Sequence, residues 1–319
     1  MLIGRGTQSC VYSPPLKFKG ANDDEKYNSR EYVSKVSTSP EIFIKENIIK
    51  DRLEQLDIPI DQYFILPEDT KTVEFVPTIS MKRECQLLKD IGYNQIYPNG
   101  GKHLRYEELF DEREAIRRLR HLIDSIIILQ TVNVFHCDIK GENILMRKGI
   151  LRLSDFGNAI ISNQFKPEET YFGSYFPFWP FWINVVALLT DRIKESELHR
   201  LYDFWCRYHI GDKKKWQSQL MTGTDFISIT IKRFQRSPDK YFEEVIIPNI
   251  GKLDVYSTIK YFEIVRDRTR GRMSRQWDLL ESQVYNPDPE QQWDVTQVSE
   301  YISSTFGVES ELSNIEVSV

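Results

Sequence analysis

The stretch VFHCDIKGENILMRKGILRLSDFGNAI, residues 134–160, concentrates charged and polar side chains in an otherwise largely apolar run. Asp138, Lys140 and Asn143 lie within six residues of one another, and Asp155 follows twelve residues after Asn143. Isolated charges among apolar residues are costly, so several charges in one short segment indicate a functional role. The order and spacing of the four residues therefore predict chemistry on a charged ligand.

The spacing also predicts how these residues act together. Apolar residues on both sides of MRKG (146–149) indicate a hairpin whose turn lies there. Because a hairpin brings its two ends together, we expect Asp155 to lie beside Asn143. Carboxylate and amide oxygens are hard ligands that suit Mg²⁺. Lys140 would then lie near a transferring anion, and Asp138 could accept the proton of a hydroxyl group.

HCDIKGENIL followed by SDFG resembles the catalytic loop and the metal loop of the eukaryotic-type protein kinases. The resemblance implies ATP and Mg²⁺ as cofactors, with Asn143 and Asp155 as metal ligands. It also implies that Asp138 is the catalytic base and that Lys140 offsets charge on the γ-phosphoryl group. The fold it implies is α+β and two-lobed: a small lobe with an antiparallel β-sheet and one helix, and a larger, mainly helical lobe.

The first residues of the chain resemble the family's glycine-rich loop. IGRGTQSCVY (3–12) has Gly4, Gly6 and Val11 in the places of the pattern G-x-G-x-x-G-x-V, with Ser9 in place of the third glycine. Glycine lets main-chain N–H groups approach phosphates closely. We therefore expect nucleotide binding there, with the serine affecting closure of the loop.

Two further residues complete the implied nucleotide site. Lys35, in the expected strand EYVSKV (31–36), resembles the family's third-strand lysine, which binds the α- and β-phosphates. A helix is expected after Ser39, and Glu46 lies on its apolar face, so Glu46 is our choice of partner for Lys35. Glu41 and Glu54 remain rivals for this position.

The segment QIYPNGGKHL (95–104) resembles the family's hinge between the two lobes. The resemblance implies that main-chain groups from Tyr97 to Asn99 bind adenine. The residue at the back of the pocket is left open. The expected domains are a nucleotide-binding lobe at 1–97, a catalytic and substrate-binding lobe at 98–295 with the hinge at 97–101, and a frayed C-terminal tail at 296–319.

The family's remaining motifs are less complete. Asp203-x-Trp205 resembles the D-x-W pattern whose aspartate braces the catalytic loop. FGSYFPFWP (172–180) resembles the substrate-binding end of the activation segment, with Ser174 in the threonine place. The A-P-E motif is absent, so we expect Phe and Trp side chains to anchor this segment. Such departures from the family's pattern resemble those of kinases encoded by large DNA viruses.

Composition limits the partners. The 319 residues include 42 Lys and Arg against 47 Asp and Glu, a net charge of −5, so nucleic acid is not an expected partner. No apolar stretch is long enough to span a membrane, so no membrane partner is expected. The four cysteines are far apart and no signal peptide opens the chain, which predicts reduced thiols in an intracellular, cytoplasmic protein, the host cytoplasm included. Oligomeric state stays unknown.

These features favour a protein kinase that transfers the γ-phosphoryl group of ATP to Ser or Thr hydroxyls of a protein substrate. Lys140, two residues after Asp138, is typical of Ser/Thr-directed members of the family. A pseudokinase that acts as a scaffold or regulator is the main alternative. A kinase of small molecules is the third reading, and the DFG triplet (155–157) argues against it.

Overall fold

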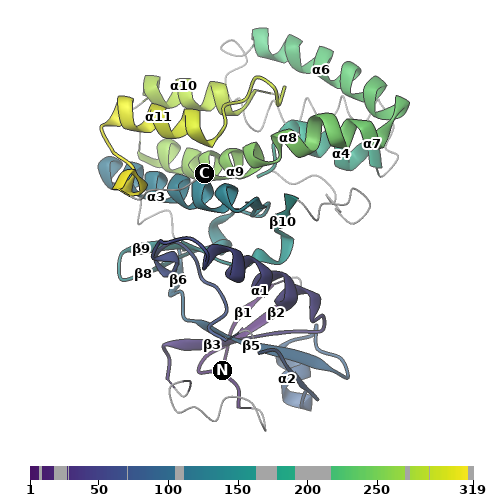
Figure 1. The fold of residues 1–319 in the computed structure, drawn as a ribbon, viewed down its shortest axis with the longest axis vertical. Coiled ribbons are helices and arrows are strands. Elements are labelled where there is room, and N and C mark those ends of the chain that lie inside the picture. Colours follow the sequence, from purple (N-terminus) through teal and green to yellow (C-terminus); the bar gives the residue numbers. More distant parts are fainter. Residues whose placement is uncertain are drawn as a thin grey trace. The chain divides into compact units, whose positions relative to one another are not determined.

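The computed structural model describes residues 1–6, 9–17, 27, 29–69, 71–104, 111–162, 178–190, 217–269, 274–286 and 288–314. The chain forms two compact units (Figure 1). The first comprises residues 1–104 and 141–159, and the second comprises residues 105–140 and 160–316. We expected one division, at residues 97–98. The chain passes from one unit to the other more than once, and the expected metal-loop hairpin belongs with the N-terminal residues.

A five-stranded antiparallel sheet forms the centre of the first unit, in the order β1-β2-β3-β5-β4. The strands are β1 (Leu2–Arg5), β2 (Ser9–Tyr12), β3 (Tyr32–Ser37), β4 (Val73–Phe75) and β5 (Gly92–Pro98). Lys35 on β3 lies opposite Val11 on β2 and opposite Gln95 on β5. Directly opposed residues share a face of the sheet, so these three side chains point the same way.

The helix α1 (Glu41–Leu53) follows β3, as the sequence predicts. It begins one residue later than expected, with Pro40 as its N-cap, and Ser39 instead accepts the main-chain N–H of Glu41. Its buried residues recur at helical spacing and include Glu46 among the apolar ones: Ile42, Phe43, Glu46, Ile49 and Leu53. An acid on the apolar face needs a buried partner.

The strand β4 ends at Phe75. Pro77 cannot donate to a strand ladder, and Thr78 caps a short helix, α2 (Ile79–Glu84), by accepting the N–H of Met81. This segment packs on the sheet face opposite to Lys35, in a cluster of Cys10, Tyr12, Val36, Phe75, Cys85 and Leu88.

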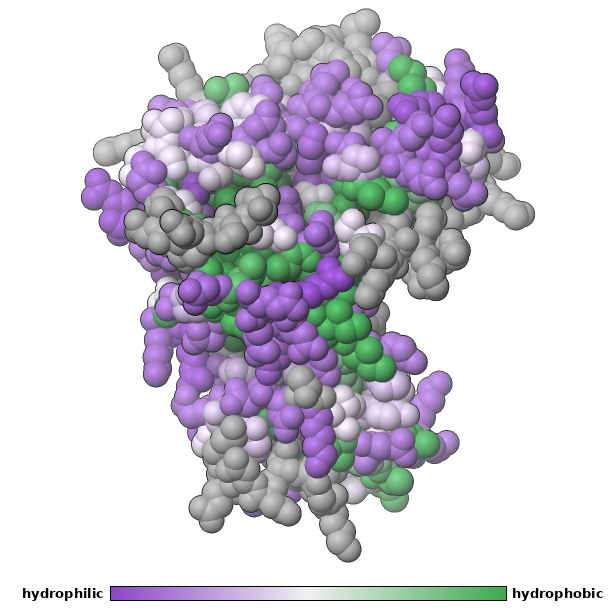
Figure 2. Space-filling model, in the orientation of Figure 1, coloured by the Kyte–Doolittle hydropathy of each residue, from purple (hydrophilic) through white to green (hydrophobic). Residues whose placement is uncertain are grey.

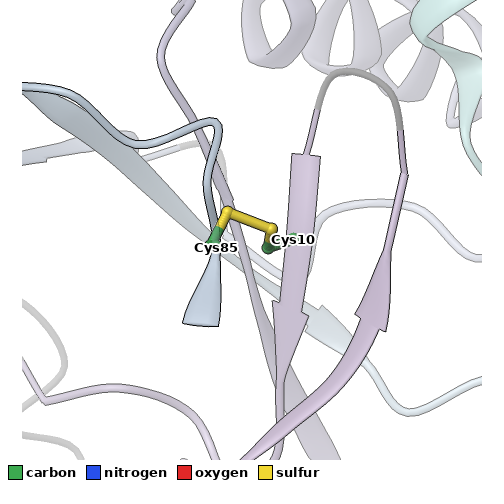
Figure 3. Close-up of a disulfide and its surroundings, with 2 residues drawn as sticks. All are labelled: Cys10 and Cys85. Carbon is green, nitrogen blue, oxygen red and sulfur yellow. A yellow bond between two sulfur atoms is a disulfide. The ribbon is translucent and has the colours of Figure 1, made fainter. Parts of the chain in front are cut away.

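A disulfide joins this segment to the sheet (Figure 3). Cys10 of β2 and Cys85, the residue after α2, are 75 positions apart in sequence and bonded to each other. The expectation of reduced thiols is therefore wrong for this pair, because two cysteines distant in sequence meet on one sheet face. Cys137 is buried and forms no disulfide within the described residues. Cys206 lies outside the described residues.

A three-stranded sheet, β6-β8-β9, contains the expected hairpin. Its strands are β6 (Lys102–His103), β8 (Ile144–Arg147) and β9 (Ile150–Leu153), and the turn is Lys148-Gly149, both at positive φ. Gly100 and Gly101 pack against β8 so closely that a Cβ at Gly101 would lie 2.2 Å from the Met146 carbonyl oxygen. Close packing, rather than a need for a flexible linker, therefore explains this glycine pair.

The second unit is mainly helical. Its long helices are α3 (Glu112–Thr131), α6 (Gln217–Arg236), α9 (Gly251–Thr269), α10 (Ser274–Val284) and α11 (Val295–Phe306). Two short strands, β7 (Val134–Phe135) and β10 (Ile160–Ile161), pair antiparallel. Residues 227–231, a possible strand by composition, lie within α6. This layout agrees with the expected α+β class.

The expected frayed tail from residue 296 is wrong for α11. Asp294 and Gln297 form a capping box at its start, and Val298 and Ile302 are buried one turn apart. The buried Arg120 of α3 donates to the main-chain oxygen of Ser299, which fastens α11 to α3. The serine-rich composition did not indicate α11, because its helical pattern lies in the capping box and in the spacing of the apolar residues.

Apolar residues 178–190 include α4 (Phe181–Thr190), whose Trp182 is fully buried in the core of the second unit. On the face drawn in Figure 2, hydrophilic residues dominate the visible surface of that unit. Among the residues described, none of the helices has both the length and the apolar character needed to cross a bilayer.

Candidate active site

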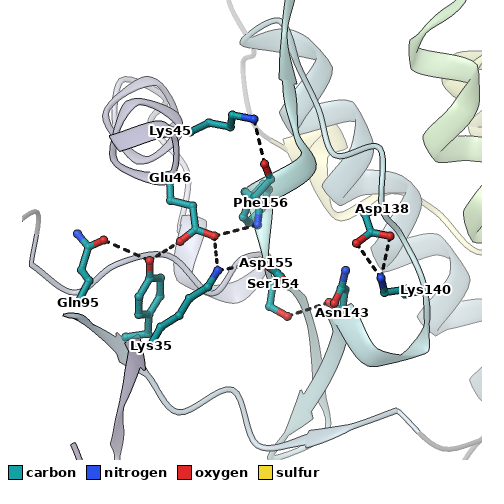
Figure 4. Close-up of polar contacts among 12 residues, drawn as sticks. Lys35, Lys45, Glu46, Gln95, Asp138, Lys140, Asn143, Ser154, Asp155 and Phe156 are labelled. Atoms are coloured by element: carbon teal, nitrogen blue, oxygen red, sulfur yellow. Dashed lines mark hydrogen bonds and ion pairs between the residues drawn. The ribbon is translucent and has the colours of Figure 1, made fainter. Parts of the chain in front are cut away.

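Lys35 and Glu46 form a buried ion pair in the first unit (Figure 4). The Lys35 Nζ lies 2.7 Å from Glu46 Oε1, and the two side chains are 9% and 2% exposed. The rival glutamates lie elsewhere: Glu41 accepts a hydrogen bond from Ser39 at the exposed start of α1, and Glu54 lies 3.6 Å from Lys50. Of the three candidates, Glu46 is the one that meets Lys35.

Asp155 lies on the other side of the same lysine. Its Oδ1 is 2.9 Å from Lys35 Nζ, and its side chain is 45% exposed, so the carboxylate faces solvent as well as the lysine. Its φ is +65°, a left-handed conformation that costs energy for a residue with a side chain. Such a conformation needs support from its surroundings.

Helix α1 supplies that support at two points. Glu46 Oε1 accepts the main-chain N–H of Phe156 at 3.1 Å, and Lys45 Nζ donates to the Gly157 carbonyl oxygen at 2.9 Å. The Phe156 ring is fully buried and makes an edge contact with Phe64. The DFG segment is therefore fastened to α1 through its main chain on both sides of the phenylalanine.

The two carboxylates beside Lys35 explain why this lysine is protonated. Burial lowers the pKa of Lys35, but Glu46 and Asp155 outweigh burial and raise that pKa above its ordinary value. The lysine is therefore a cation at neutral pH, held between two carboxylates. A dianionic ligand that displaced Asp155 would find a fixed positive charge.

Asn143 lies beside Asp155, as the hairpin predicts. Ile144 pairs with Leu153, and the Asn143 carbonyl oxygen accepts the N–H of Ser154 at 2.9 Å. The Asn143 side chain is nearly buried, while the Asp155 carboxylate is half exposed. An amide oxygen and a carboxylate on adjacent ends of one hairpin suit a hard divalent cation.

The expected hinge residues make hydrogen bonds within the first unit. Asn99 donates its main-chain N–H to the Glu31 carbonyl oxygen, and its own carbonyl oxygen accepts from Arg147. Tyr97 lies opposite Val33 in the same ladder register, where main-chain groups bond across the two strands. The Tyr97 side chain instead reaches Glu46, which no local sequence pattern indicated.

Gly4 and Gly6 lie on either side of the end of β1. Gly4 pairs with Val11, and the N–H of Gly6 donates to the Ser9 carbonyl oxygen at 2.8 Å. A Cβ would meet only ordinary contacts, 3.6 Å from Val11 at Gly4 and 3.5 Å from Ser9 at Gly6. The fold itself does not require glycine at either position.

The catalytic-loop residues belong to the second unit. Lys140 Nζ lies 2.9 and 2.8 Å from the two carboxylate oxygens of Asp138. The main-chain N–H groups of His136 and Cys137 each donate at 2.7 Å to a different oxygen of Asp254, on α9. Cys137 has φ +59°, so these two bonds hold the loop in a strained conformation.

Asp254 thus braces the loop, and Asp203, the brace expected from the sequence, lies outside the described residues. The missed signal is Asp254-Val255-Tyr256-Ser257, in which an aromatic residue follows the aspartate at the spacing of D-x-W. Burial raises the pKa of Asp254 to about 6, although His136 and the two N–H donors act in the opposite direction. The brace therefore titrates close to neutral pH.

Aromatic residues at 178–179 contact the catalytic loop and α9, at the end of the segment that we expected Phe and Trp side chains to anchor. Trp179 Nε1 donates to the Cys137 carbonyl oxygen at 3.0 Å, and Ser257 donates to the Phe178 carbonyl oxygen at 2.6 Å. The expected Ser174 lies outside the described residues.

Comparisons with known proteins agree with the motifs. Residues 73–225, just under half of the chain, match the protein kinase domain. The dual specificity protein kinase zak2 of Dictyostelium discoideum is 31% identical over 109 residues, covering 33% of this chain and 16% of that protein. The serine/threonine-protein kinase fused of Drosophila melanogaster is 24% identical over 159 residues, covering 50% of this chain and 17% of that protein.

The serine/threonine-protein kinase Sgk2 of Rattus norvegicus is 28% identical over 166 residues, which cover 51% of this chain and 41% of that protein. This chain therefore spans less than half of the length of each of these three relatives. The matched domain includes the catalytic-loop and DFG motifs quoted above. The motifs, the matched domain and the kinase relatives together support the eukaryotic-type protein kinase superfamily for this chain.

Proposed function

We propose that this chain is a protein kinase that transfers the γ-phosphoryl group of ATP to Ser or Thr hydroxyls of a protein substrate. The observation that carries the proposal is the arrangement around Lys35, which meets Glu46 at 2.7 Å and Asp155 at 2.9 Å. Three charged residues from a strand, a helix and a hairpin converge there. Phosphoryl transfer needs such fixed charges more than it needs covalent chemistry.

In this proposal the residues of the first unit hold the nucleotide. Lys35, kept charged by Glu46, binds the α- and β-phosphates. Gly4 and Gly6 let main-chain N–H groups approach the phosphates, and their geometry supports this role because the fold leaves room for a Cβ at both positions. Val11 shares the sheet face of Lys35, which suits an apolar contact with the base.

Asn143 and Asp155 would hold Mg²⁺, which neutralises phosphate charge when bound. The donor set supports the assignment, since a carboxylate and an amide oxygen lie on adjacent ends of the β8–β9 hairpin. The half-exposed Asp155 would exchange its contact with Lys35 for the ion when the nucleotide enters.

Asp138 would orient the acceptor hydroxyl and take its proton, and Lys140 would offset charge on the γ-phosphoryl group. The ion pair between them supports these roles, because it holds the two side chains next to each other in the loop. The lysine two positions after Asp138 and the names of two of the relatives support Ser/Thr acceptors.

The test is transfer of radiolabelled phosphate from ATP·Mg²⁺ to a generic basic protein. We expect Asp155→Ala and Asp138→Asn each to reduce incorporation at least about a hundredfold. Phosphoamino-acid analysis of the product should give phosphoserine and phosphothreonine. Equal incorporation by the wild type and both variants would remove the enzymatic proposal and leave a scaffold role.

A further inference from the structure

Glu46 accepts more hydrogen bonds than its ion pair with Lys35 requires. Its Oε1 accepts from Lys35 Nζ at 2.7 Å and from the N–H of Phe156 at 3.1 Å. Its Oε2 accepts from the hydroxyl of Tyr97. The Glu46 side chain is 2% exposed, so water contributes little to its solvation and each donor matters.

Tyr97 is well placed to hold this carboxylate. It is 5% exposed and packs in an apolar cluster with Val33, Phe43 and Ile65, so its ring has little freedom. The ring centroid lies 5.7 Å from Lys35 Nζ, within range of a cation–π contact. The phenol therefore touches both members of the ion pair.

The Tyr97 hydroxyl has a second acceptor within reach, the side-chain oxygen of Gln95. The Gln95 side chain donates both amide hydrogens, to Asn47 Oδ1 at 2.7 Å and to the Asp69 carbonyl oxygen at 2.8 Å. Its Oε1 is thereby turned toward the Tyr97 hydroxyl, 3.2 Å away. Because a hydrogen bond to a charged acceptor is stronger than one to an amide, the single phenolic proton goes to Glu46.

Burial and the neighbouring Glu46 raise the pKa of Tyr97 well above its ordinary value. The phenol is therefore a permanent donor, never a competing anion, at any pH at which the protein works. As a neutral phenol, Tyr97 does not compete with the Glu46 carboxylate for Lys35.

We propose that Tyr97 is a positioning residue for phosphoryl transfer, whose hydroxyl fixes the carboxylate of Glu46 so that Oε1 faces both Lys35 and the Phe156 N–H. This inference rests on the proposed function and deepens it. Without the hydroxyl, Oε2 would be a buried charged acceptor with no donor among the described residues. The carboxylate would then turn both oxygens toward Lys35, and the DFG segment would lose one of its two hydrogen bonds to α1.

The kinetic test compares Tyr97→Phe, which removes one hydroxyl, with Tyr93→Phe. Tyr93 lies on the same strand and the same sheet face, and its hydroxyl has no hydrogen bond to the described residues. We expect Tyr97→Phe to reduce kcat/KM for ATP about tenfold, as for loss of a hydrogen bond to a charged group. The KM for the protein substrate and the kinetics of Tyr93→Phe should stay within about twofold of wild type.

A purely structural role for Tyr97 would give a different pattern. It would raise the KM for protein substrate and ATP alike, or lower the melting temperature without a selective effect on ATP. Either pattern would overturn the proposal, as would wild-type kinetics in Tyr97→Phe.

A double-mutant cycle tests the same contact without any catalysis. In urea, Tyr97→Phe should shift the unfolding equilibrium constant about tenfold in the wild-type background. In the background Glu46→Leu, which has no carboxylate to hold, the same substitution should shift it less than about twofold. Equal shifts in both backgrounds would overturn the proposal. If the wild type transfers no phosphate, the proposed function fails, and this cycle still decides whether Tyr97 holds Glu46.

Discussion

In the first unit charged side chains hold one another, whereas in the second a single buried carboxylate holds a stretch of main chain. Lys35 is fixed by Glu46 and Asp155, and the pair is completed by the Tyr97 hydroxyl. The loop that carries Asp138 is fixed instead by two N–H donors to Asp254. The first arrangement sets the position of charges, and the second sets the path of the chain.

The difference is that contacts in the first unit fix the position of a charge, whereas contacts in the second unit fix the conformation of a loop. A phosphate site needs a cation in a fixed place, so opposite charges surround Lys35. The loop is strained at Cys137, and the buried Asp254 binds two consecutive amides there. The two devices should fail in different ways when they are broken.

The largest expected effect comes from breaking the ion pair on one side. Lys35→Met leaves Glu46 buried without its cation, which should lower the free energy of unfolding by about 4 kcal/mol and abolish phosphate transfer. The matched control is Lys89→Met at an exposed position, which should leave stability nearly unchanged. Urea unfolding measures both.

Replacing both partners, as Lys35→Met with Glu46→Leu, should recover part of the lost stability but none of the activity, since apolar side chains pack where charges stood. A double variant less stable than Lys35→Met would contradict the view that the unpaired carboxylate causes the loss.

The disulfide should stabilise the first unit and leave the second unchanged. Removing the Cys10–Cys85 bond by the double substitution to Ala should lower the free energy of unfolding by about 3 kcal/mol, because the bond closes a long loop. Hydrogen exchange should quicken in β2 and α2 but not in α9. Dithiothreitol should reproduce the effect in the wild type and have none in the variant; quickened exchange in α9 would show that the units are coupled.

Asp254 should make the second unit sensitive to pH. Its folded pKa of about 6 lies above the ordinary 3.8, so its contribution to stability is fully present below about pH 4 and is lost as the pH rises through 6. The whole change amounts to about 3 kcal/mol.

The measurement is urea unfolding of the wild type and of Asp254→Asn between pH 4 and 7. The wild-type free energy should fall relative to the variant over this range, because the variant has no titrating group there. Parallel curves would mean that the carboxyl keeps an ordinary pKa. Lys35 should add no slope, since its raised pKa lies beyond this range.

The smallest expected effect concerns the second hydrogen bond between α1 and the DFG segment, from Lys45 to Gly157. Lys45→Met removes a half-buried hydrogen bond to the Gly157 carbonyl oxygen and should cost about 1 kcal/mol. Phosphate transfer should fall about fivefold, since Asp155 would be less firmly oriented. Lys240→Met, on an exposed part of the second unit, is the control. A loss as large as that of Lys35→Met would show that the main-chain tie matters as much as the ion pair.

Predictions from the sequence succeeded where the signal is local or periodic. The alternation in β3 predicts which strand presents Lys35, and helical spacing in α1 puts Glu46 on the buried face. The β8–β9 hairpin predicts that Asn143 and Asp155 lie at its two ends, because the partners are only twelve residues apart. Each of these follows from backbone geometry over a few residues.

Predictions failed where the partner is remote. The composition of residues 296–306 predicted a tail, but contacts with α3 stabilise a capped helix there. The contact of Asp254 with the loop was not predicted, because Asp254 lies 117 positions from Cys137. The hydrogen bonds of the Asn99 main chain with Glu31 and Arg147 were not predicted either, since both partners are remote in sequence.

The sequence by itself determined the family, the hairpin with its two candidate metal ligands, and the strand and helix that bear Lys35 and Glu46. Only the tertiary structure decided that Tyr97 binds Glu46, that Asp254 braces the loop at Cys137, and that Cys10 bonds to Cys85. The physical reason is distance along the chain. These partners are separated by 51, 117 and 75 positions, and no local period of a strand or helix extends so far.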